Sequence, residues 1–333
     1  KTGGLADVTG ALPKALSSYG IETHTLVPGY PSILALARLL PPLMEFDDLL
    51  GEKATLRHLE IDGLSLFVLD APLLYDRPGG PYVDEHGVDH ADNWKRFAVL
   101  SLAGAEIAAG VLPGWKPDLV HTHDWQSALT SVYLRQMGSA VPVVLTIHNL
   151  AFQGQYSASL LPQIGLPPEV YSVEQMEYFG DISYLKGGLV TADHITVVSP
   201  TYAREILSPT FGMGLDGVLN ARMDRLQGIV NGIDKEIWNP ATDPYLPFRY
   251  DVKTVRNKKN NKALLLERFN LEPGDGPLFS AVTRITWQKG MDMLAEVADE
   301  IFYRGGRLIV HGQGDHDIED ALKATAARFP GRM

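Results

Sequence analysis

The chain has 333 residues, 45% hydrophobic and 21% charged, which is the composition of a globular protein with room for two domains. Its formal net charge of −11 argues against sequence-independent binding to nucleic acid, which needs a basic surface. Cysteine is absent, which excludes disulfides, thiolate metal sites and a cysteine nucleophile, and no apolar run reaches the ~20 residues of a membrane span.

The chain opens with the motif KTGG at residues 1–4, followed by apolar residues at helical spacing from Leu5 to Leu16. Adjacent glycines let a backbone approach a ligand closely, and a helix N-terminus offers N–H groups to a phosphate. The segment therefore predicts a phosphate site, with a glycine turn beside a solvated lysine as the alternative. Because such a loop normally follows a β-strand, we expect a piece of a longer protein whose opening strand lies mid-sheet.

Six short apolar runs that end in polar or glycine residues predict strands covered on both faces. They lie at 117–124, 141–149, 194–200, 228–234, 277–285 and 307–314. Helical patterns occur between them, at 91–109, 291–302 and 318–329. This alternation of strands and helices predicts an α/β fold with parallel sheets.

A break in the strand pattern divides the chain. The stretch from 239 to 276 is first rich in proline, then basic, and ends in a glycine-containing turn. We place the domain boundary near 240–245. The prediction is a first domain over 1–241 without its opening strand, a linker over 242–276 and part of a second domain over 277–333.

Polar residues gather after the predicted strands, at the sheet edge where open α/β folds bind ligands. The set comprises His121, His123, Asp124, His148, Asn149, Asn231, Arg284 and Lys289. Lys1, Arg284 and Lys289, together with two helix N-termini, predict an anion site shared by both domains. Such a site would hold a diphosphate and stabilise it as it departs with additional negative charge.

Other features of the sequence admit two interpretations. Residues 121–124 with His148 could form a metal cluster, although neighbouring strands offer few converging ligands. The acidic and histidine-rich stretch 84–92 is either solvated or in contact with substrate. The segment 312–315 (GQGD) matches only part of a dinucleotide fingerprint. Four aromatic residues could stack on sugar rings but are more often core residues: Trp94, Trp125, Phe152 and Tyr156.

Six motifs together resemble those of the bacterial glycogen synthases, which are close kin of the plant starch synthases. They are KTGGLADVTGALPKAL, HTHDWQSAL, TIHNLAFQGQY, FGMGLDGVL, IVNGIDKEIWNPATD and TRITWQKGMD. They run in the family's order and spacing from residue 1 to beyond residue 314. Ile285 is a mild departure, because the family usually has Leu there. On these motifs the chain is identified as a member of this family.

The resemblance implies the GT-B fold of the α/β class, with two Rossmann-like doubly wound domains facing a cleft and the second incomplete in this chain. It implies transfer of glucose from ADP-glucose to the non-reducing end of an α-1,4-glucan, with retention at the anomeric carbon. No metal ion, other cofactor, nucleic acid or membrane is expected to take part. The implied location is the bacterial cytoplasm.

The resemblance also assigns roles to individual residues. On the donor side, Lys1 corresponds to the donor-binding lysine, and Gly3 and Gly4 lie against the phosphates or the sugar. Arg284 and Lys289 correspond to the pair that neutralises the departing ADP.

The resemblance implies that Asp124 and His148 lie around the transferred glucose. We predict His148, Arg284 and Lys289 as the catalytic residues. Asn149 and Asn231 are predicted as further substrate-binding residues.

Two other functions compete with the transferase: a metal hydrolase built on the histidine cluster, and a catalytically inactive glucan-binding module. The family carries a C-terminal glutamate and a second glycine-rich loop, and neither occurs before Met333. We therefore expect this polypeptide, as written, to be poorly active.

Overall fold

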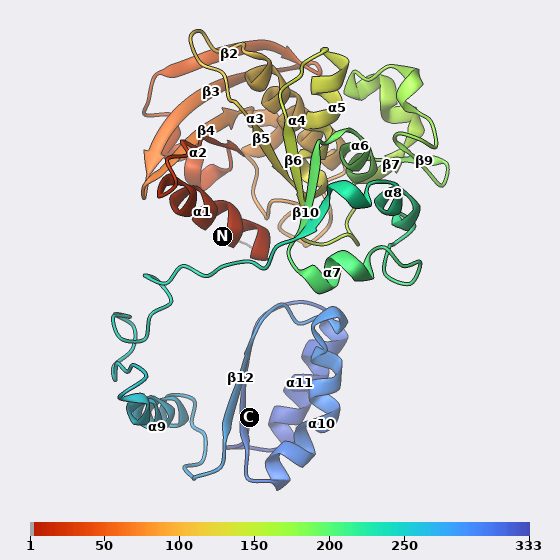
Figure 1. The fold of residues 1–333 in the computed structure, drawn as a ribbon. Helices are drawn as coiled ribbons and strands as arrows, with labels where there is room; N and C mark the ends of the chain where they lie inside the picture. Colours follow the sequence, from red (N-terminus) through yellow and green to blue (C-terminus); the bar gives the residue numbers. More distant parts are fainter. Residues whose placement is uncertain (1–2) are drawn as a thin grey trace. The chain divides into compact units, whose positions relative to one another are not determined.

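A computed structural model describes residues 3–333, so the predicted donor-binding Lys1 lies outside the described residues. The chain divides into two compact units, one ending at Gly232 and the other spanning Ile233–Met333 (Figure 1). This division falls ahead of the predicted boundary at 241, and the separate linker over 242–276 stays a prediction. Among the described residues, none of the helices combines the length and the apolar character needed to cross a bilayer.

The first unit contains a four-stranded sheet in which every pairing is parallel, in the order β11-β10-β6-β5. Its strands are β5 (Val120–His123), β6 (Val143–Ile147), β10 (His194–Val197) and β11 (Leu226–Gly228). The first three lie within the runs predicted at 117–124, 141–149 and 194–200, which are thereby confirmed.

The strand predicted at 228–234 is wrong in position, because β11 ends at Gly228. Its neighbour β10 ends at Val197, and the chain then enters helix α7 through Ser199 and Pro200. The backbone of Gly228 lies so close to Pro200 that a Cβ at Gly228 would overlap it. Without a partner strand the pairing cannot continue, so the following apolar residues are exposed.

A second sheet of the first unit was not predicted. Its order is β1-β4-β3-β2, with β1 parallel to β4 and the other pairs antiparallel. The strands are β1 (Thr25–Pro28), β2 (Pro42–Leu49), β3 (Glu52–Ile61) and β4 (Leu64–Asp70). β1 and β5 are each the edge of their own sheet.

The helices of the first unit include the one predicted to begin at the N-terminal glycines, since α1 spans Gly3–Ser17. The helix predicted at 91–109 is confirmed as α4 (Asn93–Ala109). The remaining α-helices are α2 (Pro31–Ala37), α3 (Pro72–Tyr75), α5 (Asp124–Gln136), α6 (Tyr184–Thr191), α7 (Pro200–Glu205) and α8 (Asp216–Ala221). The 3₁₀ helices are η1 (Ala158–Ile164), η2 (Pro168–Val170) and η3 (Met223–Arg225).

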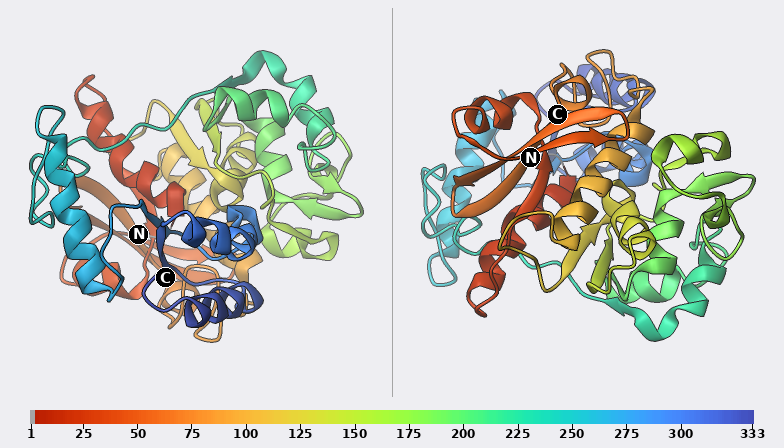
Figure 2. Two further views of the ribbon diagram at one scale, coloured as in Figure 1. Left: turned by 90° about the horizontal axis from the view of Figure 1, so that it is seen from below. Right: turned by 90° about the horizontal axis from the view of Figure 1, so that it is seen from above.

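A small antiparallel sheet lies at the margin of the first unit near α6 and α8, coloured light green in Figures 1 and 2. It consists of β7 (Gln155–Ser157), β8 (Glu177–Tyr178) and β9 (Asp181–Ser183), in the order β7-β9-β8.

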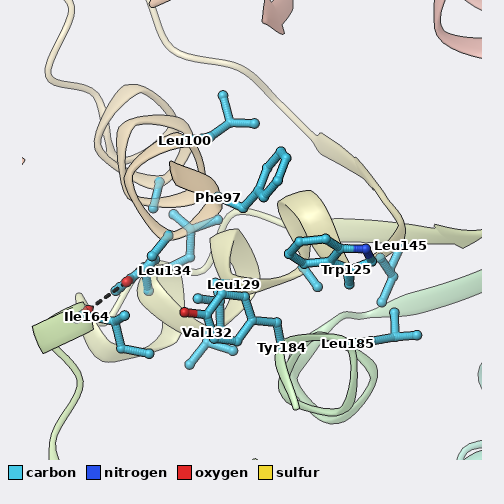
Figure 3. Close-up of a cluster of buried hydrophobic side chains, with 14 of the residues drawn as sticks. Phe97, Leu100, Trp125, Leu129, Val132, Leu134, Leu145, Ile164, Tyr184 and Leu185 are labelled. Atoms are coloured by element: carbon cyan, nitrogen blue, oxygen red, sulfur yellow. Dashed lines mark hydrogen bonds between the residues drawn. The ribbon is translucent and has the colours of Figure 1, made fainter. Parts of the chain in front are cut away.

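The main core of the first unit lies where α4, α5 and α6 pack together (Figure 3). Trp125 of α5 meets Phe97 of α4 edge to face at a ring separation of 4.7 Å, and Tyr184 of α6 at 6.4 Å. α5 and α6 pack closely at Gly188, where a Cβ would lie 2.7 Å from the Cβ of Ala128. These contacts fix α5, whose N-terminus carries Asp124.

Replacing Gly188 by alanine should lower the free energy of unfolding by about 1–3 kcal/mol, because the new methyl group has no room against α5. Gly217 of α8 is the matched control, since a Cβ there meets nothing within 4 Å. Gly217→Ala should instead stabilise by about 0.5–1 kcal/mol through helix propensity. Urea denaturation of both variants measures the difference, and equal effects of the two substitutions would contradict the close packing.

The second unit pairs two parallel strands, β12 (Leu278–Val282) and β13 (Arg307–His311), with helices α10 (Met291–Tyr303) and α11 (His316–Arg328). These elements confirm the predicted strands at 277–285 and 307–314 and the predicted helices at 291–302 and 318–329. The unit also contains α9 (Lys258–Arg268), η4 (Val255–Asn257) and η5 (Trp287–Lys289). Its core joins α10, α11 and β13 through residues such as Phe302, Leu308 and Leu322.

Candidate functional site

The candidate site of the first unit lies at the carboxyl ends of β5 and β6. Asp124 follows β5 directly, and His148 and Asn149 follow β6. One carboxylate oxygen of Asp124, Oδ1, accepts the backbone N–H of His148 at 2.6 Å and that of Asn149 at 3.3 Å. The structure therefore brings these three predicted residues together, and Asp124 holds the backbone of the loop that carries the other two.

The backbone at Asp124 is unusual. Its φ of 52° lies in the left-handed region, which residues other than glycine seldom adopt. This conformation makes the sharp turn from β5 into α5, and the residue is only 7% exposed. Burial raises the pKa of the Asp124 carboxyl to about 6, although the two backbone N–H groups act in the opposite direction.

A second anchor of the same loop was not predicted from the sequence. The hydroxyl oxygen of Tyr202, on α7, accepts the backbone N–H of Leu150 at 2.9 Å. Ser127 supports the β5 side, where its hydroxyl accepts the N–H of His123 at 2.7 Å. Tyr202 belongs to none of the quoted motifs, and Ser127 lies within HTHDWQSAL, where the sequence predicted no role for it. Each acts on a backbone group that only the folded chain brings near.

Three histidines form a row across the ends of β5 and β6. The rings of His121 and His123 stack at 4.3 Å, and Nδ1 of His123 lies 3.1 Å from Nε2 of His148 in a hydrogen bond. His121 in turn bonds the hydroxyl of Thr146 at 2.6 Å. Burial lowers the pKa of all three, to about 4 for His121 and well below the ordinary value for His123. The row is neutral at neutral pH, and a neutral His148 can hydrogen-bond a sugar hydroxyl.

The buried histidines should make the fold sensitive to acid. The folded-state pKa of His121, about 4, lies below its ordinary 6.5, so the unfolded chain binds the extra proton and stability falls as the pH drops through this window. Between pH 7 and pH 5, His121 alone should account for a loss of about 2 kcal/mol. Asp124 has the opposite sign, because its raised pKa favours the folded state as the pH falls from about 6 towards 3.8.

Denaturant titrations of the wild type and of His121→Gln at pH 7 and pH 5 separate these contributions. The substitution should reduce the pH dependence by about 2 kcal/mol. His194→Gln, at the exposed start of β10, serves as the control. An unchanged pH dependence in His121→Gln would contradict a buried neutral imidazole at this position.

The alternative of a metal cluster finds no support in the arrangement of the donor atoms. Nε2 of His121 is bound to Thr146, and the facing nitrogens of His123 and His148 bind each other rather than converging on a common point. Among residues 3–333, no group of three or more His, Cys, Asp or Glu side chains has metal-binding geometry.

Two further features of the sequence have structural explanations. In the loop 84–92, Asp84 accepts the backbone N–H groups of His86 and Val88 at 2.8 and 3.0 Å, and Asp92 pairs with Arg77 at 2.6 Å. In the segment 312–315, Gly312 and Gly314 lie directly against the carbonyl oxygens of Thr283 and Ile285, where any Cβ would overlap them. Those glycines let the loops after β12 and β13 run side by side.

The aromatic residues divide as the core interpretation predicted, with one exception. Trp125 is buried, and Trp94 and Tyr156 pack against the same core cluster. Phe152 is 51% exposed. It lies three residues after Asn149, on the loop that carries the candidate site.

In the second unit, Arg284 and Lys289 both follow β12. Both side chains are exposed, and within the described part of the chain neither forms an ion pair or a hydrogen bond. Lys289 ends η5, immediately before the Gly290 N-cap of α10. The partial positive charge at the N-terminus of α10 therefore adds to the charge of the lysine. Asn231 follows β11 in an exposed segment of the first unit without regular secondary structure. The roles predicted for these residues, and for Gly3 and Gly4 at the start of α1, remain proposals.

Comparison with known proteins gives consistent similarities. A family model described as "Starch synthase catalytic domain" matches residues 1–221. The glycogen synthase of Rhizobium leguminosarum bv. trifolii is 56% identical over the whole chain, and that of Rhizobium tropici 57%, and in both cases the chain spans 70% of the relative's length.

Among solved structures, the catalytic domain of starch synthase IV from Arabidopsis thaliana, bound to ADP and acarbose, matches with a TM-score of 0.85 at 27% identity. That match covers 99% of this chain and 69% of the other. The sucrose-phosphate synthase of Thermosynechococcus elongatus matches with a TM-score of 0.52 at 16% identity over 99% of this chain and 64% of the other, a likeness of fold alone. The predicted α/β class with Rossmann-like units of the GT-B type is confirmed.

Proposed function

This chain belongs to the family of bacterial glycogen synthases and plant starch synthases, and we propose that it transfers glucose from ADP-glucose to the non-reducing end of an α-1,4-glucan. Membership makes it a glycosyltransferase of glycogen synthesis. The use of ADP-glucose as the donor and of an α-1,4-glucan as the acceptor is our proposal. It is supported by the ADP and acarbose bound to the similar Arabidopsis catalytic domain.

The observation that carries the proposal is the pair of exposed, unpaired cations after β12. Breaking the bond between the anomeric carbon and the diphosphate leaves additional negative charge on the departing phosphate. Arg284 offers a planar fork of donors to phosphate oxygens, and Lys289 a point charge at the beginning of α10. Groups that meet charge only as it develops lower the barrier to reaction. We assign the neutralisation of the leaving nucleotide to this pair.

In the proposed reaction, the residues of the first unit position the transferred sugar. His148 is neutral and held from both sides, by its backbone N–H to Asp124 and by its ring to His123. In this role the imidazole and the amide of Asn149 orient the hexose while its bond to phosphate breaks.

Retention of the anomeric configuration is part of the same proposal. The Asp124 carboxylate is buried and already bound to two backbone N–H groups, so it is poorly placed to attack the anomeric carbon as a nucleophile. This favours a front-face route in which the acceptor hydroxyl enters on the side from which the diphosphate leaves. We propose that this reaction needs no metal ion, since the two cations supply the charge compensation.

Glucose incorporation into glycogen by the full-length enzyme tests the proposal. Labelled ADP-glucose should be used efficiently, UDP-glucose poorly, and a chelator should leave the rate unchanged. Retention of glucan on a column without any turnover would favour the inactive binding module, and loss of activity with the chelator would favour a metal enzyme. A bacterial cytoplasmic location belongs to the same proposal.

A further inference from the structure

The segment 229–233, which follows β11 and leads into the second unit, makes few bonds to the rest of the chain. Ile229 donates its N–H to the carbonyl of Val197 at 2.8 Å. Within the part of the chain that the structure describes, residues 230–233 form no hydrogen bond through either backbone or side chain, and all four are exposed. Neither hydrogen bonds nor close packing therefore restrain Asn231 and Gly232.

Asn231 and Gly232 form the only Asn-Gly pair in the sequence. Such a pair commonly occupies a tight turn in which both residues have positive φ. Neither residue has a positive φ here, and a Cβ built at Gly232 would meet nothing within 4 Å. Because glycine has no side chain to obstruct its own nitrogen, that nitrogen can approach the amide carbon Cγ of Asn231.

We propose that Asn231 is a site of spontaneous deamidation. The backbone nitrogen of Gly232 gives its proton to a base in the solvent and bonds to Cγ of Asn231, which closes a succinimide ring. The bond between Cγ and the side-chain nitrogen breaks, and this nitrogen takes up a proton and leaves as ammonia. Water then adds to either carbonyl carbon of the ring and opens it to aspartate or isoaspartate. Water is the only co-reactant.

Two other asparagines illustrate what protects an amide from this reaction. The side-chain oxygen of Asn149 accepts the N–H of Ala151 at 3.0 Å. The nitrogen that would attack Asn149 belongs to the buried Leu150, and it donates its proton to Tyr202 at 2.9 Å. Asn239 is followed by a proline, whose nitrogen carries no proton. Asn231 differs from both, because its amide and the neighbouring N–H are each free among the described residues.

The reaction would change the segment that joins the two units in charge and in length. A carboxylate replaces the amide, so one negative charge is gained and the donors of the side chain are lost. In isoaspartate the main chain also runs through the former side chain, which lengthens it by one methylene group. Asn231 is one of the predicted substrate-binding residues, but its deamidation does not depend on the proposed transferase function.

Peptide mapping by mass spectrometry of the full-length enzyme, kept in warm and mildly alkaline buffer, tests the proposal. Asn231 should be converted to succinimide, aspartate and isoaspartate, while Asn149 in the same sample stays intact. The rate should lie within about tenfold of that in a synthetic peptide of residues 228–235, a difference of ~1.4 kcal/mol in the barrier.

Gly232→Ala is the matched variant, because its Cβ has open space in the fold but hinders the approach of the nitrogen. It should slow the conversion of Asn231 by about tenfold in the enzyme and in the peptide. An enzyme in which Asn231 is still intact after the wild-type peptide has been fully converted overturns the proposal. Equal rates for the wild type and Gly232→Ala would also overturn it, since Gly232 would then not supply the attacking nitrogen.

Discussion

Replacing Lys289 by alanine in the full-length enzyme is expected to lower kcat by about 100- to 1,000-fold, the loss seen when one preorganised donor to a developing anion is removed. The ammonium group has no other partner among the described residues, so its removal leaves no internal charge unsatisfied and should not harm folding. It lies before α10, whose N-terminus favours the same anion. The KM for the glucan should not change, because the lysine acts on the departing nucleotide.

Lys259→Ala is the matched control for this prediction. Lys259 is an exposed lysine of the same unit, on α9, and its removal changes the net charge equally. The two variants should have the same thermal stability and differ only in rate. If Lys289→Ala and Lys259→Ala were equally active, the assignment of charge neutralisation to the segment after β12 would be wrong.

Five of the parallel strands and the helices α4, α10 and α11 could be predicted because each carries its own pattern, whereas α5, equal in length to α10, was not predicted. Strands such as β6 and β13 are short apolar runs between polar residues, and α10 and α11 have helical periodicity. The antiparallel strands β2–β4 were missed because they follow a different rule. β3 buries Ala54 and Leu56 in one core cluster and Leu59 in another, so it is neither a continuous apolar run nor a simple alternation. A two-residue turn with positive φ at Asp62 and Gly63 connects it to β4. An Asp-Gly turn is the available signal for such a hairpin.

The candidate site was predictable in its position but not in its internal bonding. The carboxyl ends of parallel strands lie at one edge of a sheet, so Asp124 and His148 could be expected near each other. That Asp124 binds the backbone of the next loop depends on its left-handed φ, which no residue pattern encodes. The Tyr202 anchor likewise comes from α7, which follows β10, whereas the Leu150 that it binds follows β6. Such contacts between side chain and distant backbone are products of tertiary structure.

The bonds made by Asp124 lead to a second large expected effect. Asp124→Ala removes the acceptor of two backbone N–H groups, at a cost of about 1–3 kcal/mol for each group left without a partner. The loop that carries His148 should then shift, and a displacement of about 1 Å at a positioning residue can cost about 100-fold in rate. We therefore expect Asp124→Ala to lower both the melting temperature and kcat, with kcat reduced by about 100-fold.

Asp124→Asn distinguishes positioning from direct electrostatic action. The amide oxygen can accept the same two N–H groups, whereas the charge that burial disfavours is gone. Since the pKa of the carboxyl is raised to about 6, its ionised form is held at a cost near neutral pH, and the asparagine variant should be more stable than the wild type by about 1–3 kcal/mol. If Asp124 acts by holding the loop, kcat of this variant stays within about tenfold of the wild type. A stable Asp124→Asn enzyme as slow as Asp124→Ala would show instead that the negative charge itself acts on the transferred sugar.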